Sequence, residues 1–376
     1  MKVIIAPDKF KGSITSLDAC RAIQEGILRA GNTIELLLFP MADGGDGFAE
    51  VMKYYTDTIS VAIGSFDPLG RPISSTYELN PSREIAIIEL ATCSGLAMLE
   101  LKERNPLLTS TYGTGVQIRD AIEKGAEKII LGLGGSATND GGIGIINAMG
   151  FQFVDKDGHS LKPIGQSLSQ IVKIIPPREL PVVQFEIACD VTNPLFGPEG
   201  AAFIFSPQKG ADARQVELLD NGLRNLANVI EAQTGKKVAA IPGSGAAGGI
   251  AAGLMAFFPV TMMKGTEVVV EASNLKNCVP QADVIITGEG KLDKQSFHGK
   301  TVSAISYLGK EYNIPVVALC GKVDLTDSEY GHLGLSLAWE INDGSISENE
   351  SMKEAYTLLA RKAELLLPVI KQLVAN

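Results

Sequence analysis

The feature that most constrains the fold of this chain is the glycine-rich turn at residues 132–142, which lies between two short apolar segments. The apolar run at residues 128–131 predicts a buried strand, and the segment at residues 143–149 predicts a short helix. A strand, a tight turn and a helix in this order form the repeating unit of a parallel sheet covered by helices. The chain is therefore expected to be an α/β protein.

The same turn has the chemistry of an anion-binding loop. Its glycines let backbone N–H groups converge on an oxyanion, and the start of the following helix adds partial positive charge. Asp140 adds a carboxylate that could hold a magnesium ion. We interpret the turn as a loop that binds the phosphates of a nucleotide through Gly134, Gly135, Ser136, Thr138 and Asn139.

Two other interpretations of this turn are weighed. Glycine-rich turns also occur where a strand and a helix only need to pack tightly. Gly132, Gly134 and Ala137 match the dinucleotide fingerprint, and an acidic residue, Asp155, follows at about the expected distance. However, the polar end of the turn delays the helix, and Asp140 would repel a pyrophosphate. A nucleoside triphosphate with a bound metal therefore fits better than a nicotinamide cofactor.

Composition limits the class of protein. At 376 residues the chain is long enough for two domains with substantial cores. The formal net charge of −10 argues against a nucleic acid partner, which needs a basic surface. The five cysteines include no C-x-x-C pair, so neither a disulfide framework nor a zinc site is expected. No apolar run has the length of a signal peptide or a membrane span, so a cytoplasmic protein without a membrane partner is expected.

The alternation of strand and helix patterns divides the chain into two domains. Residues 1–72 and 262–376 are expected to form a discontinuous, doubly wound parallel-sheet domain of the Rossmann or flavodoxin type. Residues 73–261 are expected to form an inserted, mixed α/β domain. A strand near residues 58–63 is assigned to the first domain, and residues 64–72 are interpreted as the crossing between domains.

Three local predictions concern single elements. Ser16 is expected to cap the first helix. Residues 202–206 are expected to form a strand. A single amphipathic helix is expected over residues 351–373, with Pro368 kinking or ending it.

Polar loops that follow predicted strands carry most of the candidate catalytic groups. Residues 8–13, 43–47 and 287–293 mix glycine with carboxylates or lysines, and Asp190 follows a further strand. Ligands of open α/β sheets bind beyond the carboxyl ends of the strands, so these loops are expected to line one cleft. Phosphoryl transfer to a small alcohol requires positioned phosphates, neutralising cations and a carboxylate near the acceptor hydroxyl. The loops supply each of these groups.

Five motifs together resemble those of the bacterial type I glycerate kinase family. They are DKFKGS at 8–13, ADGGDG at 42–47, GLGGSATNDGG at 132–142, CDVTNP at 189–194 and GEGKLD at 288–293. Their joint occurrence in this order covers essentially the whole chain and makes the resemblance specific. It implies ATP-dependent phosphorylation of D-glycerate, commonly at the 2-hydroxyl to give 2-phosphoglycerate. It also implies an active site between two domains.

We assign hypothetical roles in catalysis and substrate binding. Asp190 orients or deprotonates the glycerate hydroxyl, and Asp43 and Lys9 are the other catalytic candidates. A cation is needed to bind the glycerate carboxylate. An Arg would bind it through two parallel hydrogen bonds, whereas a Lys would act as a point charge. The candidates for binding glycerate are Lys11, Ser13, Arg71 and Asp46.

The expected cofactors are ATP and Mg²⁺. Glu289 and Asp293 join Asp140 as candidate metal ligands, because magnesium is bound by carboxylate oxygens. Gly288 and Lys291 join the glycine-rich loop as candidates for binding the nucleotide.

Other functions stay open at this point. A glycerate 3-kinase or a kinase for another small hydroxy acid would use the same groups, and a NAD-dependent dehydrogenase is a less favoured alternative. A non-catalytic sugar-acid sensor would need a way to report its signal, and no helix-turn-helix pattern or basic DNA-reading segment is found. The expected partners are glycerate and ATP, and a homodimer is left open.

Overall fold

The computed structural model describes residues 1–31, 33–297 and 300–375. The chain folds into two compact units. Unit 1 comprises Met1–Asp43, Glu50–Tyr55 and Lys264–Asn376, and unit 2 comprises Gly44–Ala49 and Thr56–Met263. Each unit has its own sheet and its own hydrophobic core.

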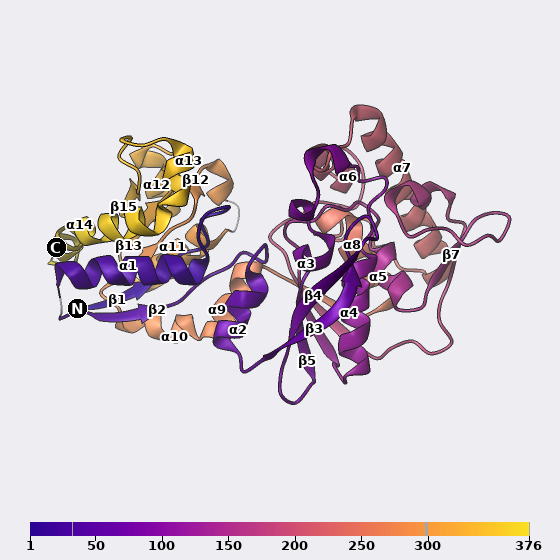
Figure 1. Ribbon diagram of the computed structural model, residues 1–376, viewed down its shortest axis with the longest axis horizontal. Helices are drawn as coiled ribbons and strands as arrows, with labels where there is room; N and C mark the ends of the chain where they lie inside the picture. The colour runs from indigo at the N-terminus through magenta and orange to yellow at the C-terminus, as the bar shows by residue number, and fades with distance from the viewer. Residues whose placement is uncertain (32, 298–299, 376) are drawn as a thin grey trace. The chain divides into compact units, whose positions relative to one another are not determined.

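Unit 1 is built on a parallel sheet of five strands in the order β15-β13-β11-β1-β2 (Figure 1). β1 (Lys2–Ile5) pairs with β2 (Glu35–Leu38) on one side and with β11 (Val284–Thr287) on the other. β13 (Val316–Cys320) and β15 (Leu337–Glu340) extend the sheet beyond β11. Counted along the chain, this is the strand order of flavodoxin-like folds.

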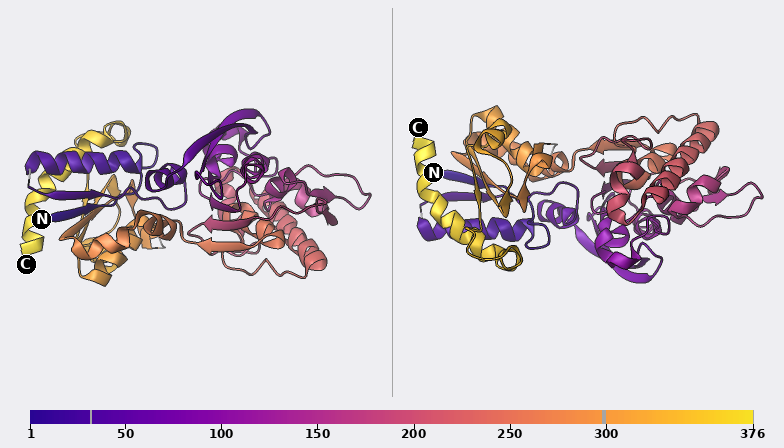
Figure 2. Two further views of the ribbon diagram at one scale, coloured as in Figure 1. Left: turned by 90° about the horizontal axis from the view of Figure 1, so that it is seen from below. Right: turned by 90° about the horizontal axis from the view of Figure 1, so that it is seen from above.

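Helices cover both faces of this sheet. α1 (Ser16–Ala30) and α14 (Ala355–Ala375) lie against each other on one face (Figure 2). α9 (Gly265–Ser273), α10 (Leu275–Cys278) and α11 (Thr301–Tyr312) lie on the other face. Apolar side chains of α1, α14 and the strands form the core on the first face. The predicted doubly wound parallel sheet, built from both ends of the chain, is confirmed.

The remaining elements of unit 1 are short. They are β12 (Lys291–Leu292) and β14 (Lys322–Val323), which pair with each other, α12 (Asp327–Leu333) and α13 (Glu348–Lys353). α2 (Phe48–Tyr55) carries residues of both units.

Unit 2 is built on a mixed sheet of six strands in the order β10-β9-β6-β5-β4-β3. These strands are β3 (Ile59–Phe66), β4 (Pro72–Leu79), β5 (Ile85–Glu89), β6 (Lys128–Gly132), β9 (Gln184–Ala188) and β10 (Val260–Met263). β5, β6, β9 and β10 run parallel, whereas β3 and β4 form an antiparallel hairpin at one edge. The predicted mixed α/β fold of the middle region is therefore confirmed.

Helices and a small second sheet complete unit 2. They are α3 (Ala91–Ser94), α4 (Tyr112–Glu123), α5 (Ile143–Ala148), α6 (Ala201–Phe205), α7 (Ala213–Thr234), α8 (Ala246–Phe257), and the paired strands β7 (Gln152–Val154) and β8 (Lys173–Ile175). The core of this unit consists of aliphatic and aromatic side chains from β5, β6 and β9 packed with those of the helices. Among the described helices, none has the length and apolar character that a membrane span requires.

The structure corrects the predicted place of the strand near residues 58–63. This strand is β3, and it pairs with β4 in the sheet of unit 2. The residues interpreted as a crossing between domains are the end of β3 and a tight turn, in which Asp67 accepts hydrogen bonds from the backbone of Leu69 and Arg71. The alternation of strand and helix patterns before residue 58 suggested that this strand joins the parallel sheet of the first domain. The partner of a strand is decided by tertiary contacts, which a local pattern does not contain.

Three local predictions are also corrected. Residues 202–206 lie mainly in the helix α6 and not in a strand. The prediction failed because a short apolar run has no periodicity that distinguishes a strand from a helix. The first helix is capped by the hydroxyl of Thr15, which accepts from the backbone of Asp18, rather than by Ser16. The predicted C-terminal helix is two helices, α13 and α14, and α14 continues through Pro368.

The contact between α1 and α14 gives a stability prediction. A Cβ at Gly26 would lie 2.0 Å from the carbonyl oxygen of Ala360. We expect Gly26→Ala to lower the free energy of unfolding by about 1 to 3 kcal/mol, because overpacking outweighs the better helix propensity of alanine. Gly331→Ala in α12 is the control, because its Cβ would meet nothing within 4 Å, and it should stabilise by up to about 1 kcal/mol. Urea denaturation measures both, and a stabilised Gly26→Ala variant would contradict this packing.

Candidate functional site

The strand order of unit 1 creates a switch point between β1 and β11. The connection after β1 leads to one face of the sheet and the connection after β11 to the other, which leaves a crevice at their carboxyl ends. The two loops are tied together there, because the backbone N–H of Asp8 donates to the carbonyl of Gly288 at 2.8 Å. Side chains of both loops are thus brought to one place.

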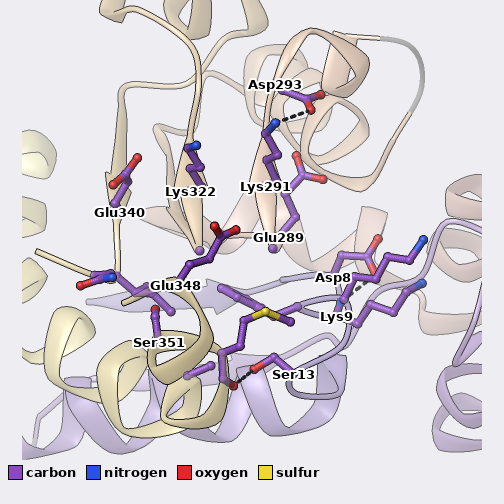
Figure 3. A pocket seen from close by; sticks show the side chains of 18 of the residues that line it. Asp8, Lys9, Ser13, Glu289, Lys291, Asp293, Lys322, Glu340, Glu348 and Ser351 are labelled. Carbon is purple, nitrogen blue, oxygen red and sulfur yellow. Dashed lines mark hydrogen bonds and ion pairs between the residues drawn. The ribbon is translucent and has the colours of Figure 1, made fainter. Parts of the chain in front are cut away.

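A cavity of about 610 Å³ lies at this carboxyl edge, and all of its lining residues belong to unit 1 (Figure 3). Most of its charged side chains come from loops that follow strands. The full set of charged groups that line the cavity consists of the carboxylates of Asp8, Asp43, Glu289, Asp293, Glu340 and Glu348 and the ammonium groups of Lys9, Lys11, Lys291, Lys300 and Lys322. A cavity with both kinds of charge suits an anionic ligand that carries a metal ion.

Asp8 is the buried carboxylate of the loop after β1, with 6% of its surface exposed. It accepts a hydrogen bond of 2.5 Å from the hydroxyl of Thr301 at the start of α11, and one of 2.7 Å from the backbone of Lys9. Burial raises the pKa of Asp8 to about 6, and the nearby carboxylate of Asp43 acts in the same direction. Lys9 opposes this shift, and its Nζ lies 3.6 Å from Asp43.

Glu289 holds the equivalent position after β11 and is 8% exposed. Its Oε1 accepts a hydrogen bond of 2.6 Å from the hydroxyl of Ser296. Burial raises the pKa of Glu289 to about 7, and the carboxylates of Asp8 and Asp293 add to the shift, whereas Ser296 and Lys300 oppose it. A cation would relieve this repulsion. Carboxylate oxygens are the ligands that magnesium prefers, so the donor set fits Mg²⁺.

The glycine-rich loop after β6 belongs to unit 2. Its glycines allow close backbone contacts, since a Cβ at Gly134 would lie 2.1 Å from the Cα of Gly45. Gly135 has a positive φ of 71° and is exposed, and a Cβ there would lie 2.3 Å from a carboxylate oxygen of Asp46. α5 begins only at Ile143, so the helix is delayed after the glycines as the sequence predicts. Tight packing and an exposed turn are therefore both present in this loop.

Asp140 organises the end of this loop and does not face solvent. It is fully buried, and its oxygens accept from the backbone and hydroxyl of Thr111 and from the backbone of Gly142 and Gly144. Burial raises the pKa of Asp140, while these hydrogen bonds oppose the shift. This geometry gives the carboxylate a structural role, because no open side is left for a metal ion. We therefore correct the prediction and leave Asp140 out of the magnesium site.

Arg71, which is predicted to bind glycerate, has two carboxylate partners within unit 2. It lies in the turn between β3 and β4, where its Nε contacts Asp67 and its Nη1 lies 2.7 Å from Glu103. These two carboxylates raise the pKa of Arg71 and engage its Nε and Nη1, while its side chain stays 48% exposed. The guanidinium thus supports the local fold of unit 2, and it is not included in the glycerate site proposed below.

The other predicted residues divide between the two units. Those at the cavity of unit 1 are Lys9, Lys11, Ser13, Asp43, Glu289, Lys291 and Asp293, with Gly288 beside them. Those in unit 2 are Asp46, Gly134, Gly135, Ser136, Thr138, Asn139 and Asp190. The roles of these residues, and a single cleft shared by their loops, stay predictions.

Sequence reasoning missed three groups. Asp8 lies within a motif that was noted, but only the fold shows that it is buried at the switch point. Glu89 ends β5 and accepts from the backbone N–H groups of Gly47 and Ala49 at the start of α2. Lys209 is buried beneath the glycine-rich loop. No sequence signal marked Glu89 or Lys209, because each acts on a segment far away along the chain.

Comparison with known proteins places the chain in a family. The sequence model of the glycerate kinase family matches residues 3–371. The chain belongs to the glycerate kinase family. The chain is 40% identical over 365 residues to a glycerate kinase of Halalkalibacterium halodurans, with 96% of each chain covered. It is 36% identical to the glycerate 2-kinase of Escherichia coli K12, again with 96% of each chain covered.

A solved structure of the glycerate kinase family agrees with this assignment. The crystal structure of a candidate glycerate kinase 2 from Salmonella typhimurium LT2 matches with a TM-score of 0.85 and 36% sequence identity, covering 99% of this chain and 98% of that one. The resemblance seen in the five motifs is therefore confirmed, as is the fold class.

The buried position of Glu289 predicts a pH-dependent cost in stability. Its pKa is raised from 4.5 to about 7 in the folded protein, so between these values the unfolded chain has released a proton that the folded chain still binds. The free energy of unfolding therefore falls as the pH rises through this window. We expect Glu289→Gln to be more stable than the wild type by about 1 to 3 kcal/mol at pH 8, with the difference shrinking toward pH 4.5.

Urea denaturation at pH 5 and pH 8 measures this difference. Glu271→Gln in α9 is the matched control, because this carboxylate is exposed, and it should change stability by less than about 0.5 kcal/mol at either pH. A Glu289→Gln variant that is less stable than the wild type at pH 8 would show that the carboxylate is not penalised by its burial.

Proposed function

We propose that this chain is an ATP-dependent kinase that phosphorylates D-glycerate at the 2-hydroxyl to give 2-phosphoglycerate. The observation that carries the proposal is the cavity at the switch point of unit 1, where buried carboxylates and lysines gather, in a chain of the glycerate kinase family. The 2-position is supported by the relative from Escherichia coli, which is named glycerate 2-kinase.

We propose that Glu289 and Asp293 hold the magnesium ion of the nucleotide. A bound Mg²⁺ supplies charge neutralisation at the phosphate oxygens. Lys291 adds a cation at the same cavity, where its Nζ lies 3.6 Å from Asp293 and 2.8 Å from Asp324. In unit 2, the phosphates are proposed to bind the loop at residues 134–139 through its accessible part, the backbone of Gly134 and Gly135 and the hydroxyl of Ser136. Thr138 and Asn139, which the sequence also suggested as ligands of the phosphates, are fully buried. The exposed Gly135 lets a ligand approach that backbone closely.

Glycerate is a small anion, and its carboxylate needs a positive partner. Lys9 and Lys11 line the cavity and are proposed to supply it as point charges. Ser13 is proposed to add its hydroxyl, which donates to the carbonyl of Met352 in this structure. The carboxylate of Asp43 pairs with the ammonium of Lys9, and that of Asp46 is proposed to accept a hydrogen bond from a hydroxyl of the substrate.

The acceptor hydroxyl must lose its proton as the new phosphate bond forms. We propose that Asp190, which follows β9 in unit 2, orients this hydroxyl and accepts the proton. Asp8 is an additional candidate for handling protons, because burial raises its pKa to about 6, closer to neutral pH than that of an ordinary carboxylate.

Incubation of the protein with ATP, Mg²⁺ and D-glycerate tests the reaction and its position. Phosphorus NMR is expected to show ADP and a phosphate monoester that couples to the single proton at C2. The product should also be consumed by added enolase without a phosphoglycerate mutase. A product that couples to the two protons at C3 and needs the mutase would establish a 3-kinase instead. Reduction of NAD⁺ by glycerate without ATP would establish a dehydrogenase.

The role of Asp190 gives a kinetic prediction. Asp190→Asn should lower kcat by at least roughly a hundredfold, since the amide cannot accept the hydroxyl proton. Asp57→Asn removes an exposed carboxylate of the same unit and serves as the control, with activity expected to be unchanged. A steady-state assay with saturating ATP and glycerate measures both variants. Near-normal turnover in Asp190→Asn would assign the residue a structural role.

A further inference from the structure

Lys209 is a buried cation beneath the glycine-rich loop. It ends a short 3-10 turn, Pro207–Lys209, between α6 and α7, and only 2% of its surface is exposed. Its Nζ donates to the backbone carbonyl of Thr138 at 2.6 Å and to the hydroxyl of Ser136 at 3.2 Å. Both acceptors belong to the segment for which phosphate binding is proposed above.

This position is costly for an ammonium group. Burial lowers the pKa of Lys209 to about 7, and the carboxylate of Asp140 acts in the opposite direction. Yet Asp140 already accepts four hydrogen bonds from other groups, and no carboxylate oxygen of the described residues lies within 4.0 Å of the Lys209 Nζ. A buried charge without a close counter-ion lowers stability. An anion at the loop would offset that cost.

The turn that carries Lys209 also holds the loop at a second point. The hydroxyl of Ser206 donates to Oδ1 of Asn139 at 3.0 Å. The Nδ2 of Asn139 is buried and has no hydrogen-bond partner among the described residues. Ser206 and Lys209 therefore hold the loop at residues 136–139 by hydrogen bonds from the protein interior, and solvent reaches Gly135 and part of Ser136.

We propose that Lys209 is a positioning residue for the phosphates of the nucleotide. It holds Ser136 and the backbone of Thr138 in place, and it contributes positive potential beneath the exposed part of the loop. Its charge acts through protein rather than through water, so its effect on a bound phosphate is larger than that of a surface lysine. This inference rests on the proposed function, in which the loop binds the phosphates of ATP.

The test compares two variants whose side chains are one atom shorter than that of lysine. Lys209→Met removes the charge and the hydrogen bonds, whereas Lys209→Gln removes the charge and keeps a donor. Both should raise the KM for ATP by roughly tenfold or more, a loss of about 1.4 kcal/mol of binding free energy, and change the KM for glycerate by less than about twofold. Calorimetric titration with a non-hydrolysable ATP analogue and Mg²⁺ should show the same loss of affinity.

Lys237→Met is the matched control. This lysine is also in unit 2, but its side chain is 81% exposed and pairs with Glu231 at the surface. Its replacement should leave both KM values and the affinity for the analogue unchanged. Circular dichroism and thermal unfolding establish which variants are folded, so that a loss of binding is not confused with a loss of structure.

Each outcome decides the inference. Folded Lys209 variants with an unchanged KM for ATP, or with equal losses for ATP and glycerate, would overturn it. If neither variant folds, Lys209 is only a residue of the core, and the inference is again overturned. Failure of the proposed function is distinguishable, because the wild-type protein would then show no transfer of phosphate from ATP to glycerate.

Discussion

The parallel pairing of β1 with β11 is the interaction on which the candidate site depends. It joins segments about 280 residues apart along the chain, with Val3 opposite Val284 and Ile5 opposite Ile286. The two strands then send their following loops to opposite faces of the sheet, so that Asp8 and Glu289 meet at one crevice. Without this pairing the two carboxylates would be separate and solvated, and burial would not shift their pKa values.

A second constraint is the close approach of backbone segments around the glycine-rich loop. Gly134 packs on the Cα of Gly45, and Gly248 packs on the carbonyl of Thr138, where no Cβ would fit. Polar side chains then complete the hydrogen bonding of the buried part. Asp140 accepts from the backbone of Gly142, and Lys209 donates to the carbonyl of Thr138. A loop held in this way is pre-organised, which is what binding of a phosphate requires of backbone donors.

Strong local patterns in the sequence correspond to elements of the structure. Residues 213–234 repeat apolar side chains at helical spacing, and the structure has α7 over Ala213–Thr234. The glycine loop and its delayed helix also follow from local chemistry. Prediction failed where local patterns leave a choice, as for α6, whose five residues contain no period, and for β3, whose sheet partner is chosen by the fold. The role of Asp140 was misjudged, and the carboxylate partners of Arg71 were not foreseen, because burial and partners are properties of the folded chain.

The sequence by itself determined the α/β class, the family resemblance and the chemical types in each loop, since these depend on patterns within short segments. Only the tertiary structure decided which carboxylates are buried, which charges are paired and which lysine lies under the glycine loop. The physical reason is that desolvation and ion pairing depend on distances between residues that are remote along the chain. Asp8 and Thr301 lie 293 positions apart, yet they share a hydrogen bond of 2.5 Å.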